Sequence, residues 1–185
     1  MKRLGTVLVA VVLVSSGCSA GDLSVDEYAA SVEARAGSYA EEVTSLADKN
    51  ISELDVAVAR LQRDFEGESL VEAAVAETAR LAAMLFAGIG DALDRFVQDL
   101  DETDAPSDVE SDHRAYVAAL EASRIGIAPL LADLTSATTF DDIDRAIASS
   151  GYSDAQPRVI AACASLQDAI GGLGSVVDLR CEPDV

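Results

Sequence analysis

The sequence predicts an all-α protein: a mostly antiparallel bundle of about four long helices plus one short helix, with a C-terminal tail tied back by a disulfide. Apolar residues recur in steps of three and four over long stretches, which is the spacing of one helix face. Serine followed three residues later by glutamate marks two helix starts. No stretch of useful length alternates apolar and polar residues as a half-buried strand does.

The first predicted helix begins at Ser24, which has the capping-box spacing with Glu27. Its apolar stripe is Val25, Tyr28, Val32, Ala36, Tyr39, Val43, Leu46, Ile51, Leu54, Val58, Leu61 and Phe65. The two tyrosines of this stripe are expected to pack in the core with their hydroxyls at its edge. Whether residues 24–66 form one helix or two stays open, because Asn50 and Glu53 have the spacing of a second start.

The second predicted helix follows a turn at Gly67 and runs from about Glu68 to Leu100. Such a short connection favours antiparallel neighbours. The middle of this helix is slim, with alanine and glycine at positions 83, 87, 88 and 90. We therefore expect another helix to approach it closely there.

The third predicted helix opens after a polar loop at 101–108, where Ser107 and Glu110 repeat the capping-box spacing. Its apolar residues continue to Leu134. Pro129 lies inside this range and is expected to kink the helix, because its ring removes a backbone donor.

The short helix is predicted between Thr139, its N-cap, and Gly151. The last helix is predicted to begin near Pro157, since proline suits the first turn of a helix. It should stop in the glycine-rich stretch 171–174, after which the tail 176–181 is placed to fold back.

The chain opens with a basic start, an apolar run and small residues before a cysteine: Met1, Lys2, Arg3, then 4–14, then Ser15, Ser16, Gly17 and Cys18. This layout is that of an export signal, and its end resembles the bacterial lipobox. Ser15, at the usual leucine position, departs from the most common form. The apolar run is too short to span a bilayer, and an ordinary secretory signal is the alternative.

The resemblance implies that residues 1–17 are a lipoprotein signal peptide and that Cys18 carries the lipid. The chain would then be exported and anchored to the outer face of the cell membrane, or to the periplasmic face of an envelope membrane. Residues 18–23 would be a short tether spanning under about 20 Å. Residues 24–185 are long enough for one helical-bundle domain.

The chain has three cysteines, an odd number that needs an explanation in an exported protein. With lipid on Cys18, Cys163 and Cys181 remain as a pair. An oxidising compartment would let them persist as a disulfide. Two unpaired thiols are the alternative.

The charge is strongly acidic, with 33 Asp and Glu against 13 Lys and Arg and a formal net charge of −20. Such a chain repels nucleic acid and anionic headgroups. We therefore expect no nucleic-acid partner.

Candidate chemistry is sparse. The one histidine, His113, stands near Asp108, Glu110 and Asp112, and these four are the nearest approach to a metal site. A solvated acidic helix start explains them more simply, so we expect no metal and no cofactor. No Gly-x-Ser-x-Gly elbow is present and general-base capacity is low, so we expect no catalytic residues and no enzyme.

The sequence thus predicts a lipid-anchored, non-catalytic binding or interaction module of the cell envelope, with an envelope protein as its candidate partner. The alternative is a small-ligand or cation receptor with a pocket between helices, placed where Pro129 and the 88–90 segment loosen the packing.

Overall fold

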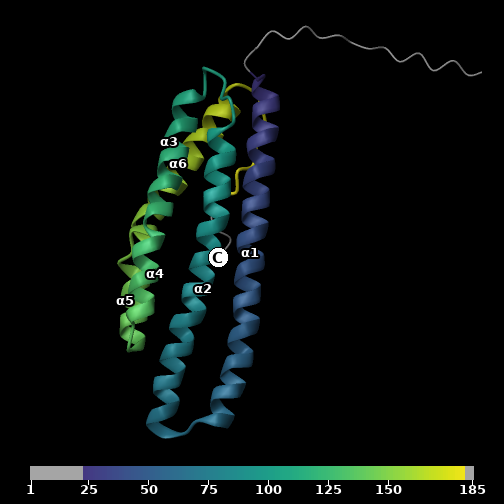
Figure 1. The fold of residues 1–185 in the computed structure, drawn as a ribbon. Coiled ribbons are helices and arrows are strands. Elements are labelled where there is room, and N and C mark those ends of the chain that lie inside the picture. Colours follow the sequence, from purple (N-terminus) through teal and green to yellow (C-terminus); the bar gives the residue numbers. More distant parts are fainter. Residues whose placement is uncertain (1–22, 182–185) are drawn as a thin grey trace, which may run out of the picture.

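The computed structural model describes residues 23–181, in which all regular secondary structure is helical. Figure 1 shows the six helices: α1 (Val25–Asp64), α2 (Gly67–Asp101), α3 (Glu110–Ile125), α4 (Ile127–Ser136), α5 (Phe140–Ala148) and α6 (Gly151–Gly172). The predicted all-α class is confirmed. The predicted signal peptide and Cys18 lie outside the described residues and stay predictions.

Helices α1 and α2 form a long antiparallel hairpin. The predicted capping box at the start of α1 is present, with Ser24 accepting from the Glu27 amide and Glu27 accepting from the Ser24 amide. The helix is unbroken through 48–50. Asn50 does not cap a second start, because its side-chain amide donates to the Leu81 carbonyl on α2 at 2.8 Å. The turn between the helices uses Gly67, whose φ of 59° is a left-handed conformation that glycine adopts without strain.

The slim middle of α2 receives α1, as predicted. A Cβ atom on Gly88 would lie 2.8 Å from the end of the Leu46 side chain of α1, so a larger residue there would require this side chain to shift. Gly90 is less critical, since a Cβ there would meet Ile127 at an ordinary 3.4 Å.

The third predicted helix is divided into α3 and α4. Its predicted Ser107–Glu110 capping box is wrong: α3 begins at Glu110 after Val109, without a side-chain cap. The interruption falls at Gly126, not at Pro129. A Cβ on Gly126 would come within 2.1 Å of the Tyr152 backbone nitrogen, so the close approach of α6 sets this break. Pro129 then occupies the first turn of α4, where no intrahelical donor is required.

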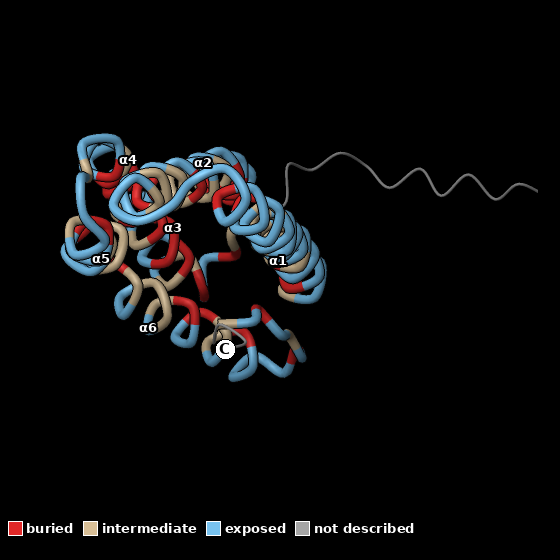
Figure 2. The backbone as a smooth tube through the Cα atoms, turned by 90° about the horizontal axis from the view of Figure 1, so that it is seen from below, coloured by how far each residue is buried: buried red, intermediate tan, exposed pale blue. Residues whose placement is uncertain are grey.

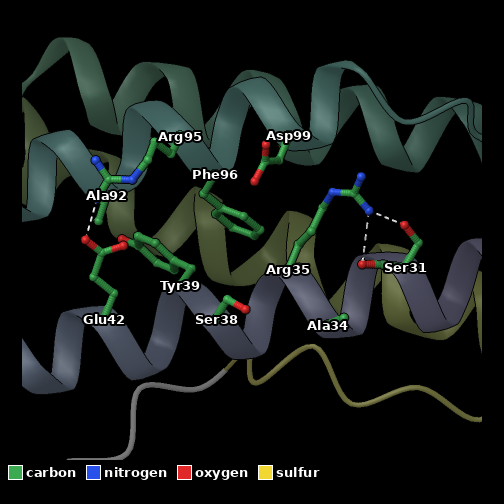
Figure 3. Close-up of a pocket in the computed structure, with 10 residues that line it drawn as sticks. All are labelled: Ser31, Ala34, Arg35, Ser38, Tyr39, Glu42, Ala92, Arg95, Phe96 and Asp99. Carbon is green, nitrogen blue, oxygen red and sulfur yellow. Dashed lines mark hydrogen bonds and ion pairs between the residues drawn. The ribbon is translucent and has the colours of Figure 1, made fainter.

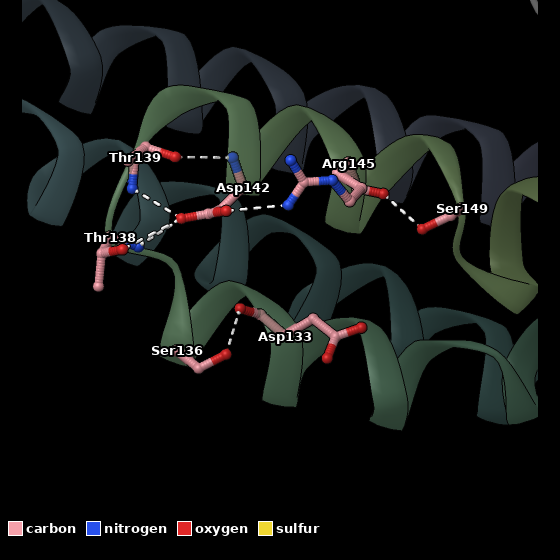
Figure 4. A network of polar contacts seen from close by, with 7 residues as sticks. All are labelled: Asp133, Ser136, Thr138, Thr139, Asp142, Arg145 and Ser149. Carbon is pink, nitrogen blue, oxygen red and sulfur yellow. Dashed lines mark hydrogen bonds and ion pairs between the residues drawn. The ribbon is translucent and has the colours of Figure 1, made fainter.

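The short helix α5 begins as predicted, with Thr139 as its N-cap, but ends at Ala148. Figure 4 shows the network around Asp142, whose carboxylate accepts from the Thr139 amide at 3.0 Å and from the Arg145 guanidinium at 3.0 Å. The hydrogen bond with the Thr139 side chain, together with bonds from Thr138 and Arg145, lowers the pKa of Asp142 to about 2. This reciprocal capping fixes the start of α5.

The predicted start of the last helix at Pro157 is wrong. α6 begins at Gly151, and Ser150 caps it by accepting from the Ser153 amide at 3.0 Å. Pro157 lies inside the helix. It forfeits the one backbone hydrogen bond that its own nitrogen would make, and the contacts of α6 with α3 hold the helix together.

The C-terminal tail folds back along α6, which confirms the prediction. Cys163 and Cys181 form a disulfide, and the Leu179 amide donates to Gln167 Oε1 at 2.9 Å. Ser175 also hydrogen-bonds Asp26 of α1. We call residues 175–181 the C-terminal strap, because they link α6 to α1.

Two hydrophobic clusters hold the helices together. The larger joins α1, α2, α3 and α6, and the smaller joins α2, α4 and α5 through Val75, Leu130, Leu134 and Ile143. Figure 2 shows these buried segments facing inward. The stretch 110–136 is long and apolar enough, by length and composition alone, to cross a membrane. Its buried apolar residues nevertheless belong to these clusters, as expected of a core helix in a folded bundle.

Candidate functional site

A cavity of about 320 Å³ lies between α1, α2, α3, α6 and the C-terminal strap. Its volume is within the range of pockets that bind small molecules. Much of its wall is apolar, with these larger aliphatic side chains: Val43, Leu93, Leu120, Val159, Ile160 and Leu179. We call it the tyrosine cavity, because Tyr39, Tyr116 and Tyr152 line it from three different helices.

The three rings are held by aromatic neighbours. Tyr39 stacks on Phe96 with ring centroids 4.8 Å apart and planes at 10°. Phe96 in turn meets Tyr116 edge to face at 6.2 Å, and Tyr152 meets Phe86 in the same way at 5.5 Å. Paired aromatic rings of this kind pack with specific geometry, so the tyrosines present their hydroxyl groups from fixed positions.

Burial raises the pKa of all three tyrosines above the ordinary value of 10. The pKa of Tyr39 is raised further by Tyr152 and Tyr116, since the three phenol groups are close enough to interact electrostatically. The hydroxyl groups therefore stay protonated at physiological pH. Each can donate one hydrogen bond.

The remaining polar groups lie on the α3 and α6 side and on the strap. Gln156 Nε2 donates to Ser123 Oγ at 3.1 Å. Arg180 is the one charged residue among those described that line the cavity, and it is exposed to solvent. Its φ of 51° is unusual for a residue with a side chain. The next residue, Cys181, is fixed by the disulfide.

A second hollow of about 330 Å³ lies between α1 and α2 (Figure 3). It is open, and both of its arginines are bonded within the protein: Arg95 contacts Glu42, and Arg35 donates to Ser31. These contacts leave the arginines less free to hold a ligand.

A third hollow, of about 560 Å³, lies between α2 and α4 beside Ala83, Ala87 and Leu131. It is an open surface groove. Neither Pro129 nor the 88–90 segment lines this groove or the tyrosine cavity. The sequence predicts a pocket at Pro129 and residues 88–90, and the cavity lies elsewhere. The reason is that the space beside Gly88 and Gly90 is filled by neighbouring side chains.

The four residues nearest to a metal-site pattern are dispersed. His113 is buried beside Tyr28, Asp112 accepts from Ser165 at 2.6 Å, and Glu110 pairs with Arg114. Asp108 precedes α3 in a turn. Between residues 23 and 181 no three His, Cys, Asp or Glu side chains are grouped as a metal site requires.

An exposed apolar face lies on the distal half of the α1–α2 hairpin. Ile51, Leu54, Val58 and Phe65, which the sequence placed on the apolar stripe of α1, are all exposed, with Ile51 at 59%. We call these four residues the distal stripe. The face that α1 turns to α2 here contains Asn50, Ala57 and Leu61 instead.

Comparison with protein-family models, with curated proteins and with solved structures finds no match to this chain. The features that bear on function are the predicted leader, the tyrosine cavity and the distal stripe. Sequence reasoning did not identify the cavity. Tyr39 was assigned to core packing, and no local pattern connects it with Tyr116 and Tyr152.

Proposed function

We propose that this protein is a lipid-anchored, non-catalytic binding module of the cell envelope, and that it holds a small, mostly apolar molecule in the tyrosine cavity. The observation that carries this proposal is the cavity itself, an apolar space of ligand size with a few polar groups. Its described lining contains no carboxylate, histidine or free thiol, the groups that acid–base and nucleophilic catalysis use most. This composition supports binding rather than turnover.

The anchoring part of the proposal rests on the leader and is tested at Cys18. The Cys18→Ser substitution should move the protein from the membrane fraction to the soluble fraction. A Cys163→Ser, Cys181→Ser double variant serves as the control, because it also loses thiol groups but should stay in the membrane fraction. Retention of the Cys18→Ser protein on membranes would refute the lipid anchor.

The binding part is tested by filling the cavity. Ala40 lines the cavity, whereas Ala59 is exposed on the same helix and does not line it. The neutral fluorophore N-phenyl-1-naphthylamine should bind saturably to the Cys18→Ser chain. We expect Ala40→Trp to weaken this binding at least tenfold and Ala59→Trp to leave it unchanged. Equal binding by both variants, with intact helical circular dichroism, would exclude the cavity as the site.

Docking of a protein partner on the distal stripe is the second candidate function. An exposed apolar patch in a soluble domain is a recognised mark of an interaction site, and Val56, near the stripe, is 69% exposed. A photo-crosslinking residue at Leu54 should capture a discrete product in intact membranes, while the same residue at Ala59 should not. The same set of products from both positions would remove this candidate.

A further inference from the structure

We infer that the tyrosine cavity selects a neutral molecule with an accepting oxygen, such as a carbonyl, held by the hydroxyl groups of Tyr39, Tyr116 and Tyr152. This deepens the proposed function and requires that the cavity bind a ligand at all. The three residues reach the cavity from α1, α3 and α6, so that only the assembled bundle brings them to one cavity. They lie close enough for Tyr116 and Tyr152 to influence Tyr39 electrostatically.

The hydroxyl groups of the three tyrosines lack a hydrogen-bond partner within residues 23–181. Among the described residues no hydrogen bond involves the hydroxyl of Tyr39, Tyr116 or Tyr152, whereas the fourth tyrosine, Tyr28, is bonded to His113. Tyr116 is only 4% exposed, and yet no fully enclosed side-chain oxygen or nitrogen among these residues lacks a partner. The Tyr116 hydroxyl must therefore touch open space, and the space that this residue lines is the cavity.

A protonated phenol can donate a hydrogen bond, and apolar walls around it offer no acceptor. A tyrosine phenol is protonated at neutral pH even at its ordinary pKa, and burial raises the pKa of these three further. Polar groups in an apolar setting are stabilised when they are hydrogen-bonded. An oxygen acceptor on the ligand satisfies them, whereas a hydrocarbon of the same shape leaves them without a partner.

The charge around the cavity disfavours ionic ligands. An anion would lose hydration on entering the apolar interior and would meet a chain of net charge −20. An organic cation could be drawn by the aromatic rings. However, one face of Tyr39 is already covered by Phe96, and no described lining residue supplies a carboxylate. Among the described lining residues Arg180 alone is charged, and it would repel a cation. Arg180 would attract an anion, but this residue is exposed to solvent, where such an attraction contributes little. A neutral ligand meets none of these penalties.

The test compares four tyrosine variants with three naphthalene probes. Prodan is neutral and carries a ketone, N-phenyl-1-naphthylamine is neutral without a carbonyl, and 1-anilinonaphthalene-8-sulfonate is anionic. Fluorescence titration of the Cys18→Ser chain should give Prodan a Kd at least tenfold lower than either of the others. Choline in large excess should not displace Prodan.

Replacing the phenols by phenylalanine removes the donors and keeps the rings. Each of Tyr39→Phe, Tyr116→Phe and Tyr152→Phe should weaken Prodan binding about fivefold and leave the Kd of N-phenyl-1-naphthylamine within about twofold. Tyr28→Phe is the matched control, since its ring does not line the cavity. It should change neither affinity.

Other outcomes contradict the inference. If the three cavity variants weaken both neutral probes equally, the hydroxyl groups only shape the cavity. If the sulfonate binds as tightly as Prodan, the preference for neutral ligands is wrong, and displacement by choline would reveal an aromatic site for cations. If no probe binds saturably, the proposed function fails as well. The first three outcomes leave the proposed function standing.

Discussion

The hydroxyl oxygen of Tyr28 lies 2.8 Å from Nδ1 of His113, a residue 85 positions further along the chain. The two rings meet edge to face with centroids 5.7 Å apart. Both residues are buried, Tyr28 completely. This contact ties the first turns of α1 to the first turns of α3, and it occupies the histidine that the sequence offered as a metal ligand.

Removing the Tyr28 hydroxyl should destabilise the fold. In Tyr28→Phe the Nδ1 atom of buried His113 loses its partner, and an unsatisfied buried polar group costs about 1–3 kcal/mol. Urea denaturation should show this decrease in the free energy of unfolding. Tyr39→Phe is the control, because its hydroxyl has no protein partner among the described residues, and it should change stability by less than about 0.5 kcal/mol. Equal effects would show that the contact contributes nothing.

Stability should depend on the protonation of His113. Burial, the largest cause, lowers the pKa of His113 below its ordinary value of 6.5, although the Leu100 carbonyl partly opposes it. The folded state therefore binds fewer protons than the unfolded state just below pH 6.5. Stability is fully present above pH 6.5 and is lost as pH falls from there toward the lowered pKa.

This pH dependence can be isolated with His113→Gln. Free energies of unfolding measured between pH 7.5 and 5.5 should fall for the wild type and fall less for the variant, which has no imidazole to protonate. Parallel curves for the two proteins would show that the pKa of His113 is the same in the folded and unfolded states.

Gly126→Ala should be among the most damaging single substitutions in the chain. The added Cβ would meet the backbone of Gly151 and Tyr152 at 2.3 and 2.1 Å, and backbone cannot move aside as a side-chain end can. We expect a loss of at least about 3 kcal/mol. Gly171→Ala is the control, because nothing lies within 4 Å of a Cβ there. Similar melting temperatures for the two variants would contradict the close approach of α6.

The disulfide should stabilise both the fold and the cavity. Cys163 and Cys181 are 18 residues apart, and closing a loop of this size contributes about 3 kcal/mol in the chain-entropy treatment. The Cys163→Ala, Cys181→Ala double variant should unfold at correspondingly lower urea concentration. It should also bind Prodan more weakly, because Leu179 and Cys181 form part of the cavity wall. Unchanged Prodan affinity would show that the strap keeps its place without the disulfide.

The sequence was sufficient to predict three features: the all-α class, the α1–α2 hairpin and the disulfide. The first two depend on patterns within short stretches, and the third depends on the number of cysteines. Apolar periodicity, a capping box at Ser24 and a turn at Gly67 lie in short stretches of sequence. The pairing of Cys163 with Cys181 followed once Cys18 was assigned to the lipid. The close approach of α1 to α2 was also predictable, because small residues are concentrated in the middle of α2.

The errors occurred where tertiary contacts decide the local structure. Asn50 has the spacing of a helix cap but bonds α2 instead. Gly126, rather than Pro129, interrupts the third helix because α6 approaches it there. Pro157 suggests a helix start, although Ser150 provides the cap seven residues before it.

The tyrosine cavity could not be predicted for the same reason. Tyr39, Tyr116 and Tyr152 are far apart in sequence, and each reads as an ordinary aromatic residue of a helix. The distal stripe is the opposite case. Its periodicity is visible in the sequence, but the sequence does not show that, among the described helices, the distal half of α1 lies beside α2 alone (Figure 1).

The length of α1 has a consequence for an anchored protein. Its 40 residues extend about 60 Å, and the predicted anchor, Cys18, precedes its first residue, Val25, by seven positions in the sequence. With α1 upright on the bilayer, Tyr39 stands about 20 Å above the start of the helix, and the distal stripe stands about 40–60 Å above it. The molecule would then offer its small-molecule site near the lipid surface and its protein-docking face far out in the envelope, at two heights that one rigid helix sets.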